Sequence, residues 1–256
     1  MTPRVLLYVQ HLLGIGHLVR TGRLAAALAA AGFEVDIVMG GEAVPVFATS
    51  GMRVLQLPPV RAGPEGFSAL LDQAGKPVDE AFWTERRARL LAAFDSVRPD
   101  ILIIEAFPFG RRQMRPELLP LLAAAHGRPD RPLVVCSIRD ILQESTKPDR
   151  AEETVAVLRE FFDLVLVHGD PSFVRLDATF RLAHEIASLI RYTGMIGPPP
   201  AAPAQDRFDV VVSAGGGAVG LRLLRAALEA RPATRLAEVR WCLVTGPNLD
   251  RAAAME

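Results

Sequence analysis

Short, uninterrupted apolar runs alternate with helical patterns along most of the chain, and this alternation constrains the fold more than any other feature. Runs such as "VLLYV" (5–9), "ILIIE" (101–105) and "LVLVH" (164–168) have the length of strands but lack the apolar–polar alternation of half-buried strands. Strands buried on both faces are typical of parallel sheets that helices cover on each side. The sequence therefore predicts an α/β fold with a doubly wound parallel sheet.

The alternation also sets the expected bounds of the elements. The segment 58–80 interrupts it, and we interpret the apolar stretch "GFSALL" (66–71) within it as a cap on the core or, alternatively, as a lid or a lipid-contacting surface. The expected strands are 5–9, 34–39, 52–57, 100–105, 132–138, 163–168 and 190–194, and the expected helices are 18–31, 79–97, 111–125, 151–162 and most of 172–188.

The pattern restarts after the proline-rich stretch "GPPPAAPAQDR" (197–207), which reads as a stiff linker. We therefore expect a Rossmann-like domain over 1–196 and an incomplete second Rossmann-like unit over 208–256, with one βαβ motif. Two strands and one helix cannot cover their own apolar faces. We expect this unit to be the first third of a larger domain, or to pack on the first domain or on another chain, and self-association through it is expected.

Composition excludes several classes of partner. The formal net charge is zero, which gives no electrostatic case for a nucleic-acid partner, and the arginine runs "RRARL" (86–90) and "GRRQMR" (110–115) are expected on solvated helix faces. The two cysteines, Cys136 and Cys242, lie inside apolar runs and suit a reducing cytoplasm. No apolar stretch of about 18 residues occurs, so no transmembrane segment is predicted; peripheral membrane contact is retained as an alternative.

Glycine and polar residues follow several of the expected strands. Ligands of open parallel sheets bind beyond the carboxyl ends of the strands, so these residues are candidates for a site. They are Gly14, Gly16 and His17 after the first strand, Glu105 at the end of the fourth, Arg139 and Asp140 after the fifth, and His168 and Asp170 after the sixth.

His17 opens an expected helix, where the helix dipole disfavours the charged form of its imidazole. A neutral imidazole near physiological pH can accept a proton, and so can deprotonate an alcohol that attacks an electrophilic carbon. Such a base works better when a carboxylate orients its other nitrogen, and either Glu105 or Asp140 could supply one.

Purely structural roles stay open as alternatives for the same residues. The turn "GIGH" (14–17) lacks the third glycine of a dinucleotide fingerprint, and its histidine can be incidental to a tight turn. Glu105 can instead form a structural pair with Arg111 or Arg112. His168 and Asp170 can belong to a turn and a helix cap.

A second glycine cluster, "SAGGGAVG" (213–220), follows a strand and opens a helix. Backbone N–H groups at such a helix start can bind the oxygens of a diphosphate, and the residues concerned are Gly215, Gly216, Gly217 and Gly220. His11 and His17 share a loop, but no further ligands stand at a metal-binding spacing, so no metal is expected.

Six stretches of the chain together resemble glycosyltransferases of the GT-B fold. They are "GIGHLVRTGRLAAALAAAGFEV" (14–35), "IEAFPFGRRQMRPELLPLL" (104–122), "SIRDILQ" (137–143), "VLVHGDP" (165–171), "GGGAVGLRLLRAAL" (215–228) and "VRWCLVTGPN" (239–248). More narrowly, the likeness is to the N-acetylglucosaminyltransferases that act on the peptidoglycan lipid precursor and to their uncharacterised relatives. It spans nearly the whole chain, so the first Rossmann-like domain is expected to be a GT-B N-terminal, acceptor-side domain.

The resemblance implies an inverting, metal-independent transfer of a sugar from a nucleotide diphosphate sugar, the co-substrate, to a small or lipid-linked alcohol acceptor, with no further cofactor. It implies that His17 is the catalytic base, with Glu105 beside it, and that Gly215, Gly216, Gly217 and Gly220 bind the donor phosphates. On the acceptor side it implies Gly14, Gly16, Arg20, Arg139, Asp140 and His168.

Enzymes of the resembled family continue for well over a hundred residues beyond this point, including the part that grips the donor base and ribose. We therefore expect this chain to bind a donor weakly or not at all and to turn over little. Two other classes are kept beside the enzyme: a non-catalytic sugar- or lipid-binding module, and a sugar-nucleotide epimerase of similar fold.

Overall fold

The computed structural model describes residues 2–12, 14–44, 52–63, 66–143, 149–198, 202, 206–215 and 220–245. The chain divides into two compact units, one of Met1–His11 with His17–Gly197 and the other of Leu12–Gly16 with Pro198–Glu256. The roles and boundaries expected for the two domains stay a prediction.

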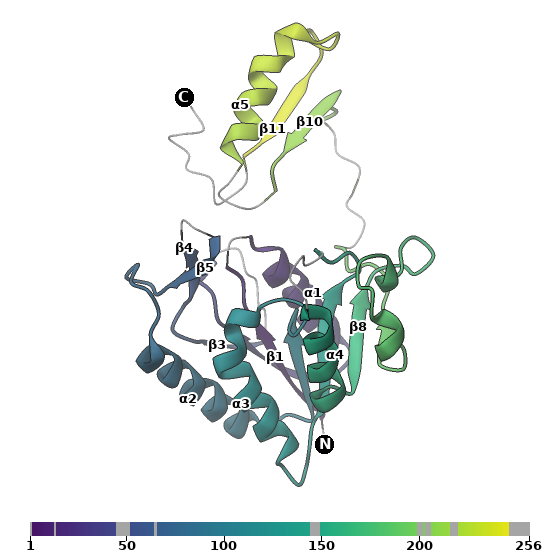
Figure 1. Cartoon of the computed structure of the whole chain (residues 1–256). Coiled ribbons are helices and arrows are strands. Elements are labelled where there is room, and N and C mark those ends of the chain that lie inside the picture. Colours follow the sequence, from purple (N-terminus) through teal and green to yellow (C-terminus); the bar gives the residue numbers. More distant parts are fainter. Residues whose placement is uncertain are drawn as a thin grey trace. The chain divides into compact units, whose positions relative to one another are not determined.

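The large unit is built on a seven-stranded sheet in the order β3-β2-β1-β6-β7-β8-β9, and every neighbouring pair is parallel. This is the doubly wound α/β sheet that the continuous apolar runs predict (Figure 1). Its strands are β1 (Arg4–Val9), β2 (Glu34–Met39), β3 (Arg53–Gln56), β6 (Ile101–Glu105), β7 (Leu133–Arg139), β8 (Leu164–His168) and β9 (Ile190–Tyr192).

Helices cover both faces of this sheet, and α1 lies on the face opposite α2, α3 and α4 (Figure 1). Alternate residues of a strand point to opposite faces. The odd-numbered residues of β1, which are Val5, Leu7 and Val9, accordingly pack in one core with Leu18 of α1. The helices are α1 (Gly16–Ala30), α2 (Glu80–Val97), α3 (Arg115–His126) and α4 (Arg150–Phe161), and η1 (Arg112–Met114) precedes α3.

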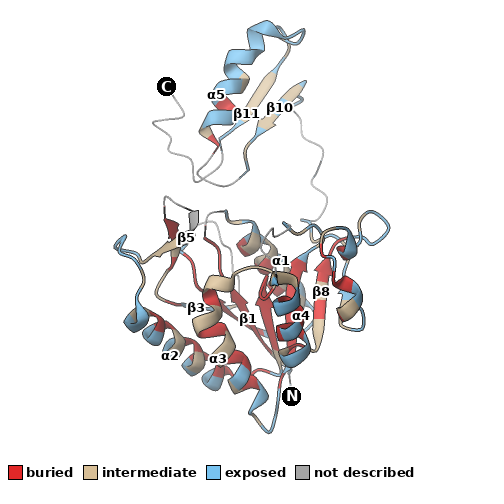
Figure 2. Ribbon diagram, viewed as in Figure 1, coloured by how far each residue is buried: buried red, intermediate tan, exposed pale blue. Residues whose placement is uncertain are grey.

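The core strands are buried along most of their length, whereas the edge strand β3 is exposed (Figure 2). Helix α2 begins at an N-cap, because the side chain of Asp79 accepts a hydrogen bond from the backbone N–H of Phe82 at 2.8 Å. It ends where Arg98 adopts a left-handed conformation with φ of 48°. Within the described residues, no helix is both long and apolar enough to span a bilayer.

Two expected elements differ from the structure. The segment 58–80 contains an antiparallel hairpin of β4 (Arg61–Gly63) and β5 (Gly66–Leu71), so "GFSALL" is a strand. The segment 172–188 holds only short 3-10 turns, η2 (Leu176–Ala178) and η3 (Ala183–Ile186), rather than a helix. The carboxylate of Asp170 accepts bonds from Ser172, and the N–H of Leu176 donates to the hydroxyl of Tyr192, so local side chains replace helical hydrogen bonds.

The arginine run "RRARL" (86–90) was expected on a solvated helix face, and this prediction is wrong for Arg86, which is fully buried. Its guanidinium forms a bidentate ion pair with Glu117 of α3, with Nε–Oε2 and Nη2–Oε1 distances of 2.7 Å, and Glu117 also accepts a bond from the hydroxyl of Tyr8. The same guanidinium donates to the carbonyl oxygens of Gly40 and Pro58, which follow β2 and β3. One buried cation therefore ties two helices to the ends of two strands.

The small unit contains a parallel pair of strands, β10 (Val210–Ser213) and β11 (Trp241–Val244), joined through α5 (Leu221–Ala230) and η4 (Arg231–Ala233). Leu224 of α5 is buried, whereas Leu223, Leu228 and Val211 are exposed. Apolar side chains on both the helix and a strand of this unit thus face solvent, as expected for two strands and one helix.

Candidate active site

The strand order of the large sheet reverses between β1 and β6. The chain leaves β1 toward β2 on one side and leaves β6 toward β7 on the other, so their carboxyl ends flank the topological switch point. Open α/β sheets bind ligands in the crevice at this point. Of the sequence candidates, His17 follows β1 and Glu105 ends β6, so the topology places this pair at the switch point.

His17 and Glu105 are in contact. The imidazole Nδ1 lies 2.9 Å from Oε1 of Glu105. The carboxylate is buried, with 1% of its side chain exposed, whereas 29% of the His17 side chain is exposed. Of the two carboxylates considered from the sequence, Glu105 is therefore the one beside His17.

Arg20 of α1 contacts the same carboxylate oxygen, and its Nη2 also lies 3.2 Å from Nδ1 of His17. A guanidinium and a carboxylate cannot both be satisfied by Nδ1, because the first only donates and the second only accepts. Since Glu105 lies closer, we assign the proton to Nδ1 and the lone pair to Nε2. In this tautomer, Nε2 is the ring nitrogen that can accept a proton from a ligand.

Burial lowers the pKa of His17, and the nearby charges of Arg111 and Arg20 lower it further, against the hydrogen bond and the charge of Glu105, which raise it. The imidazole is therefore neutral at neutral pH. Burial would raise the pKa of Glu105, but the hydrogen bonds and charge of His17 and Arg20 hold it below its ordinary value. The pair is thus a neutral base beside an ionised carboxylate.

Gly14 and Gly16 are exposed, and neither has the left-handed φ that would require glycine. A Cβ added at either position would meet no atom of the described residues within 4 Å, apart from its neighbours in the chain and its own helix. The protein's own packing therefore gives no reason for glycine here. Close approach of a ligand to the backbone is a physical reason that remains.

His168 and Ser137 lie directly behind Glu105. Ser137 Oγ is 2.5 Å from Oε2 of Glu105 and 2.9 Å from Nε2 of His168, whose Nδ1 is 2.8 Å from Oγ1 of Thr193. His168 is buried, and both ring nitrogens are engaged within the chain. This favours a place behind Glu105 over direct contact with an acceptor. Ser137 was not among the sequence candidates, because a single hydroxyl inside an apolar strand gives no spacing signal.

The other acceptor-side candidates do not join this cluster through any described hydrogen bond. Arg139 is the exposed last residue of β7. The Asp140 carboxylate accepts a bond from the N–H of Ile141 at 2.9 Å. Arg112 pairs with Glu153 rather than with Glu105, while Nε of Arg111 donates to the carbonyl of Gln10 at 2.8 Å.

The glycine cluster of the small unit is described only in part. Gly215 is left-handed, with φ of 76°, and Gly220 directly precedes α5. A Cβ at Gly220 would collide with the side chain of Ala214. Gly216 and Gly217 lie outside the described residues, so the diphosphate-binding role of the cluster stays a prediction.

The surroundings of His11 and His17 bear on metal binding. His11 is buried, and a side chain at Gly41 would collide with its ring. Across the portion of the chain that the structure describes, no group of three or more His, Cys, Asp or Glu residues is arranged to hold a metal ion.

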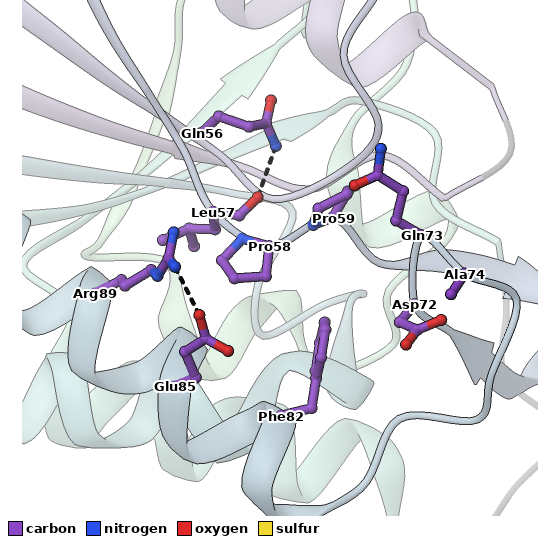
Figure 3. Close-up of a pocket in the computed structure, with 10 residues that line it drawn as sticks. All are labelled: Gln56, Leu57, Pro58, Pro59, Asp72, Gln73, Ala74, Phe82, Glu85 and Arg89. Atoms are coloured by element: carbon purple, nitrogen blue, oxygen red, sulfur yellow. Dashed lines mark hydrogen bonds and ion pairs between the residues drawn. The ribbon is translucent and has the colours of Figure 1, made fainter.

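A separate pocket of about 450 Å³ opens between the end of β3, the turn after β5 and α2 (Figure 3). Several of its polar groups are engaged within the chain, since the amide nitrogen of Gln56 lies within hydrogen-bond distance of three carbonyl oxygens and Glu85 pairs with Arg89. Neither His17 nor Glu105 lines it. The switch point is therefore the better candidate for chemistry.

No protein-family model and no curated protein matches the sequence. Solved structures do match. SsfS6, a glycosyltransferase of Streptomyces sp. SF2575, aligns with 99% of this chain and 73% of its own, at a TM-score of 0.53 and 16% identity. CalG4, the calicheamicin glycosyltransferase, aligns with 100% of this chain and 69% of its own, at a TM-score of 0.53 and 19% identity.

A UGT transferase from Siraitia grosvenorii, solved in complex with UDP, aligns with 99% of this chain and 67% of its own, at a TM-score of 0.52 and 13% identity. Identities this low speak to fold and not to substrate. Together with the seven-stranded parallel sheet, these likenesses show that the chain has the fold of the GT-B glycosyltransferases.

Proposed function

We propose that this chain carries the base of an inverting, metal-independent glycosyltransferase that moves a sugar from a nucleotide diphosphate sugar to an alcohol acceptor. The observation that carries the proposal is the contact between Nδ1 of His17 and Oε1 of Glu105 at the switch point of the sheet. The GT-B fold and the complex of one structural neighbour with UDP support the choice of donor.

In the proposed reaction, Nε2 of His17 takes the proton of the acceptor hydroxyl while the hydroxyl oxygen attacks the anomeric carbon. The new C–O bond forms on the face opposite the leaving group, so the anomeric configuration inverts. The bond to the diphosphate breaks, and its electron pair leaves on the phosphate oxygen. Glu105 keeps its negative charge and stabilises the imidazolium that results.

The leaving diphosphate needs stabilisation of its developing negative charge. We assign this to backbone N–H groups at Gly215, Gly216, Gly217 and Gly220, where the start of α5 contributes its dipole. Gly14 and Gly16 keep the space before α1 free of side chains, which suits an acceptor that approaches His17 closely.

A transfer assay tests the proposal. The chain is incubated with UDP-glucose and other nucleoside diphosphate sugars in the presence of a panel of phenols and aliphatic alcohols, and with a chelator. We expect a glycoside of inverted configuration, formed slowly because this chain is expected to bind the donor weakly, and formed equally well with chelator. His17→Ala should lower the rate by about 100-fold or more, as is typical for loss of a general base.

His184→Ala is the matched control, because it removes an exposed imidazole on η3 and should leave the rate unchanged. Isomerised sugar nucleotide without a glycoside would point to an epimerase. Binding of donor or acceptor with no product in any reaction would point to a binding module. Either result would reject the transferase.

A further inference from the structure

We propose that Ser137 and His168 are positioning residues, which hold the Glu105 carboxylate through a buried hydrogen-bond chain and so set the proton affinity of His17. The chain runs across three adjacent strands of the large sheet, from β6 through β7 to β8. The effect on proton affinity follows from geometry alone, whereas the effect on turnover rests on the proposed function.

Strand register brings these residues together. Glu105 is paired with Ser137 between β6 and β7, and His168 at the end of β8 is paired with Arg139, two residues beyond Ser137 on the same face of the sheet. Alternation places Glu105 and Ser137 on the same face of the sheet as Ile103 and Val135, which is the face that α1 covers. His17 and Arg20 reach Glu105 from that helix. All three strand residues are buried.

The hydrogen bonds have a single consistent direction. Oε2 of the ionised Glu105 only accepts, so the one proton of the Ser137 hydroxyl must point to it. Ser137 Oγ can then bind His168 only as an acceptor, which places a proton on Nε2 of His168. Burial lowers the pKa of His168 to about 4, so the ring is neutral and its Nδ1 accepts from Thr193, whose hydroxyl lies nearer to Nδ1, at 2.8 Å, than to the carbonyl oxygen of Gly194, at 3.1 Å. Every proton in the chain of bonds is thereby assigned.

This arrangement uses both oxygens of Glu105. Oε1 faces His17 and Arg20, and Oε2 faces Ser137. The carboxylate cannot rotate without breaking a buried hydrogen bond. The hydroxyl of Ser137 also withdraws negative charge from the carboxylate, and a bond from His168 strengthens that hydroxyl as a donor. Loss of the Ser137 hydroxyl should therefore make Glu105 more basic and stabilise the His17 imidazolium.

Other charged groups face the same residues. The charges of Arg111 and Arg20 lower the pKa of His17, and the charge of His17 in turn lowers the pKa of His11. Besides burial, which lowers the pKa of His168, the charge of Glu105 raises that pKa and the charge of Arg20 lowers it. Substitutions at Ser137 and His168 leave all these charges in place.

A neighbouring thiol is also present. Cys136 precedes Ser137 in β7, and burial raises the pKa of its thiol far above neutrality, so it stays uncharged. It therefore adds no charge to the surroundings of Glu105.

Histidine NMR on the full chain tests the inference. The wild-type spectrum should show His168 as the Nε2–H tautomer at neutral pH. Ser137→Ala should raise the pKa of His17 by about half a unit or more, and His168→Leu should raise it by less. Ser137→Thr and His168→Gln, which each keep a donor, should restore values near wild type. Thr193→Val should have the smallest effect.

An Nδ1–H tautomer of His168, or an unchanged His17 pKa in Ser137→Ala, would overturn the inference. So would a Ser137→Thr protein that shifts as far as Ser137→Ala. If one Ser137 variant fails to fold, the two His168 variants provide the test, because the pKa of His17 should rise in His168→Leu and stay near the wild-type value in His168→Gln. If the chain transfers sugar, Ser137→Ala should lower kcat by about 10-fold with KM nearly unchanged. A His17 shift without transfer by the wild-type protein rejects the transferase and keeps the positioning chain.

Discussion

Nδ1 of His17 lies 2.9 Å from Oε1 of Glu105, although the two residues are 88 positions apart in the chain. Glu105 raises the pKa of His17 through its hydrogen bond and its charge, whereas Arg20 lowers that pKa. A general base works only when it is unprotonated, so the rate falls as the pH drops through its pKa. Because burial lowers the pKa of His17, the wild-type rate should stay constant as the pH is lowered through about 6.5, the ordinary pKa of histidine, and should fall only at lower pH.

Substitutions of Glu105 and Arg20 should shift the pH at which the rate falls on the acid side, and they should shift it in opposite directions. Glu105→Gln should shift it to lower pH and reduce the maximal rate by about 100-fold or more, because an amide can favour the wrong tautomer. Arg20→Met should shift it to higher pH. The measurement is kcat/KM against pH for each variant, and shifts of the same sign would contradict the assignment of Arg20 and Glu105 to opposite effects.

Gly16→Ala should separate ligand binding from stability. A Cβ at this position meets no atom of the described residues within 4 Å beyond its neighbours in the chain and its own helix, and the backbone is not left-handed. The change in free energy of unfolding should therefore be within about 0.5 kcal/mol. If the space admits an acceptor, the KM for the alcohol should rise about 10-fold.

Gly220→Ala provides a contrast, because its Cβ would collide with Ala214. This variant should lose stability in thermal denaturation, whereas Gly16→Ala should not. An acceptor KM that Gly16→Ala leaves unchanged would mean that the space before α1 is not used by the acceptor.

His168 should make the fold sensitive to acid. Its pKa is about 4 in the folded chain, because the ring is buried, and about 6.5 when unfolded. The unfolded state therefore binds a proton first as pH falls. The stability that the neutral ring contributes is complete above about pH 6.5 and is lost progressively toward about pH 4, amounting to about 3 kcal/mol. Urea denaturation at both ends of this range measures the loss.

His168→Gln should show a shallower decline over the same range, since glutamine does not titrate. Groups common to both proteins cancel in the comparison. Parallel declines in the two proteins would mean that His168 titrates normally in the folded state.

Arg86 should be far more important to stability than its neighbour Arg89. Both lie on α2 and both pair with a glutamate, but Arg86 and Glu117 are fully buried, whereas Arg89 and Glu85 are more than half exposed. Arg86→Met leaves a buried carboxylate without its cation and should cost about 3–5 kcal/mol. Arg89→Met should cost less than about 1 kcal/mol. Chemical denaturation of the two variants measures the difference.

Replacing both partners, with Arg86→Met and Glu117→Gln, should recover part of the loss, because no uncompensated charge then remains buried. A double variant less stable than Arg86→Met alone would contradict this explanation.

The sheet was predictable because its strands are short, continuous apolar runs. The expected strands 5–9 and 163–168 agree with β1 and β8 to within one residue at each end. The strand-end rule also predicted that His17 and Glu105 lie at one edge of the sheet, because parallel strands present all their carboxyl ends there. The two side chains are in contact in the structure, and their roles stay a prediction.

Features that depend on side-chain partners were not predictable. Arg86 stands in a run of arginines that has the composition of a solvated helix face, and only its pairing with Glu117, 31 positions away, explains its burial. The segment 172–188 has helix-forming residues, but the side chains of Asp170 and Tyr192 accept from the backbone N–H groups of Ser172 and Leu176. Ser137 was passed over because a single hydroxyl inside an apolar strand is common and carries no spacing signal.

The sheet face that α1 covers changes character along the strand axis. It is apolar at Ile103 and Val135, and it becomes polar at the next residue of each strand on that side, Glu105 and Ser137. The residues that pack the domain and the residues around the proposed base therefore occupy successive positions on one face of the sheet. Substitutions at the last position would change the proposed chemistry and leave the apolar packing beneath it in place.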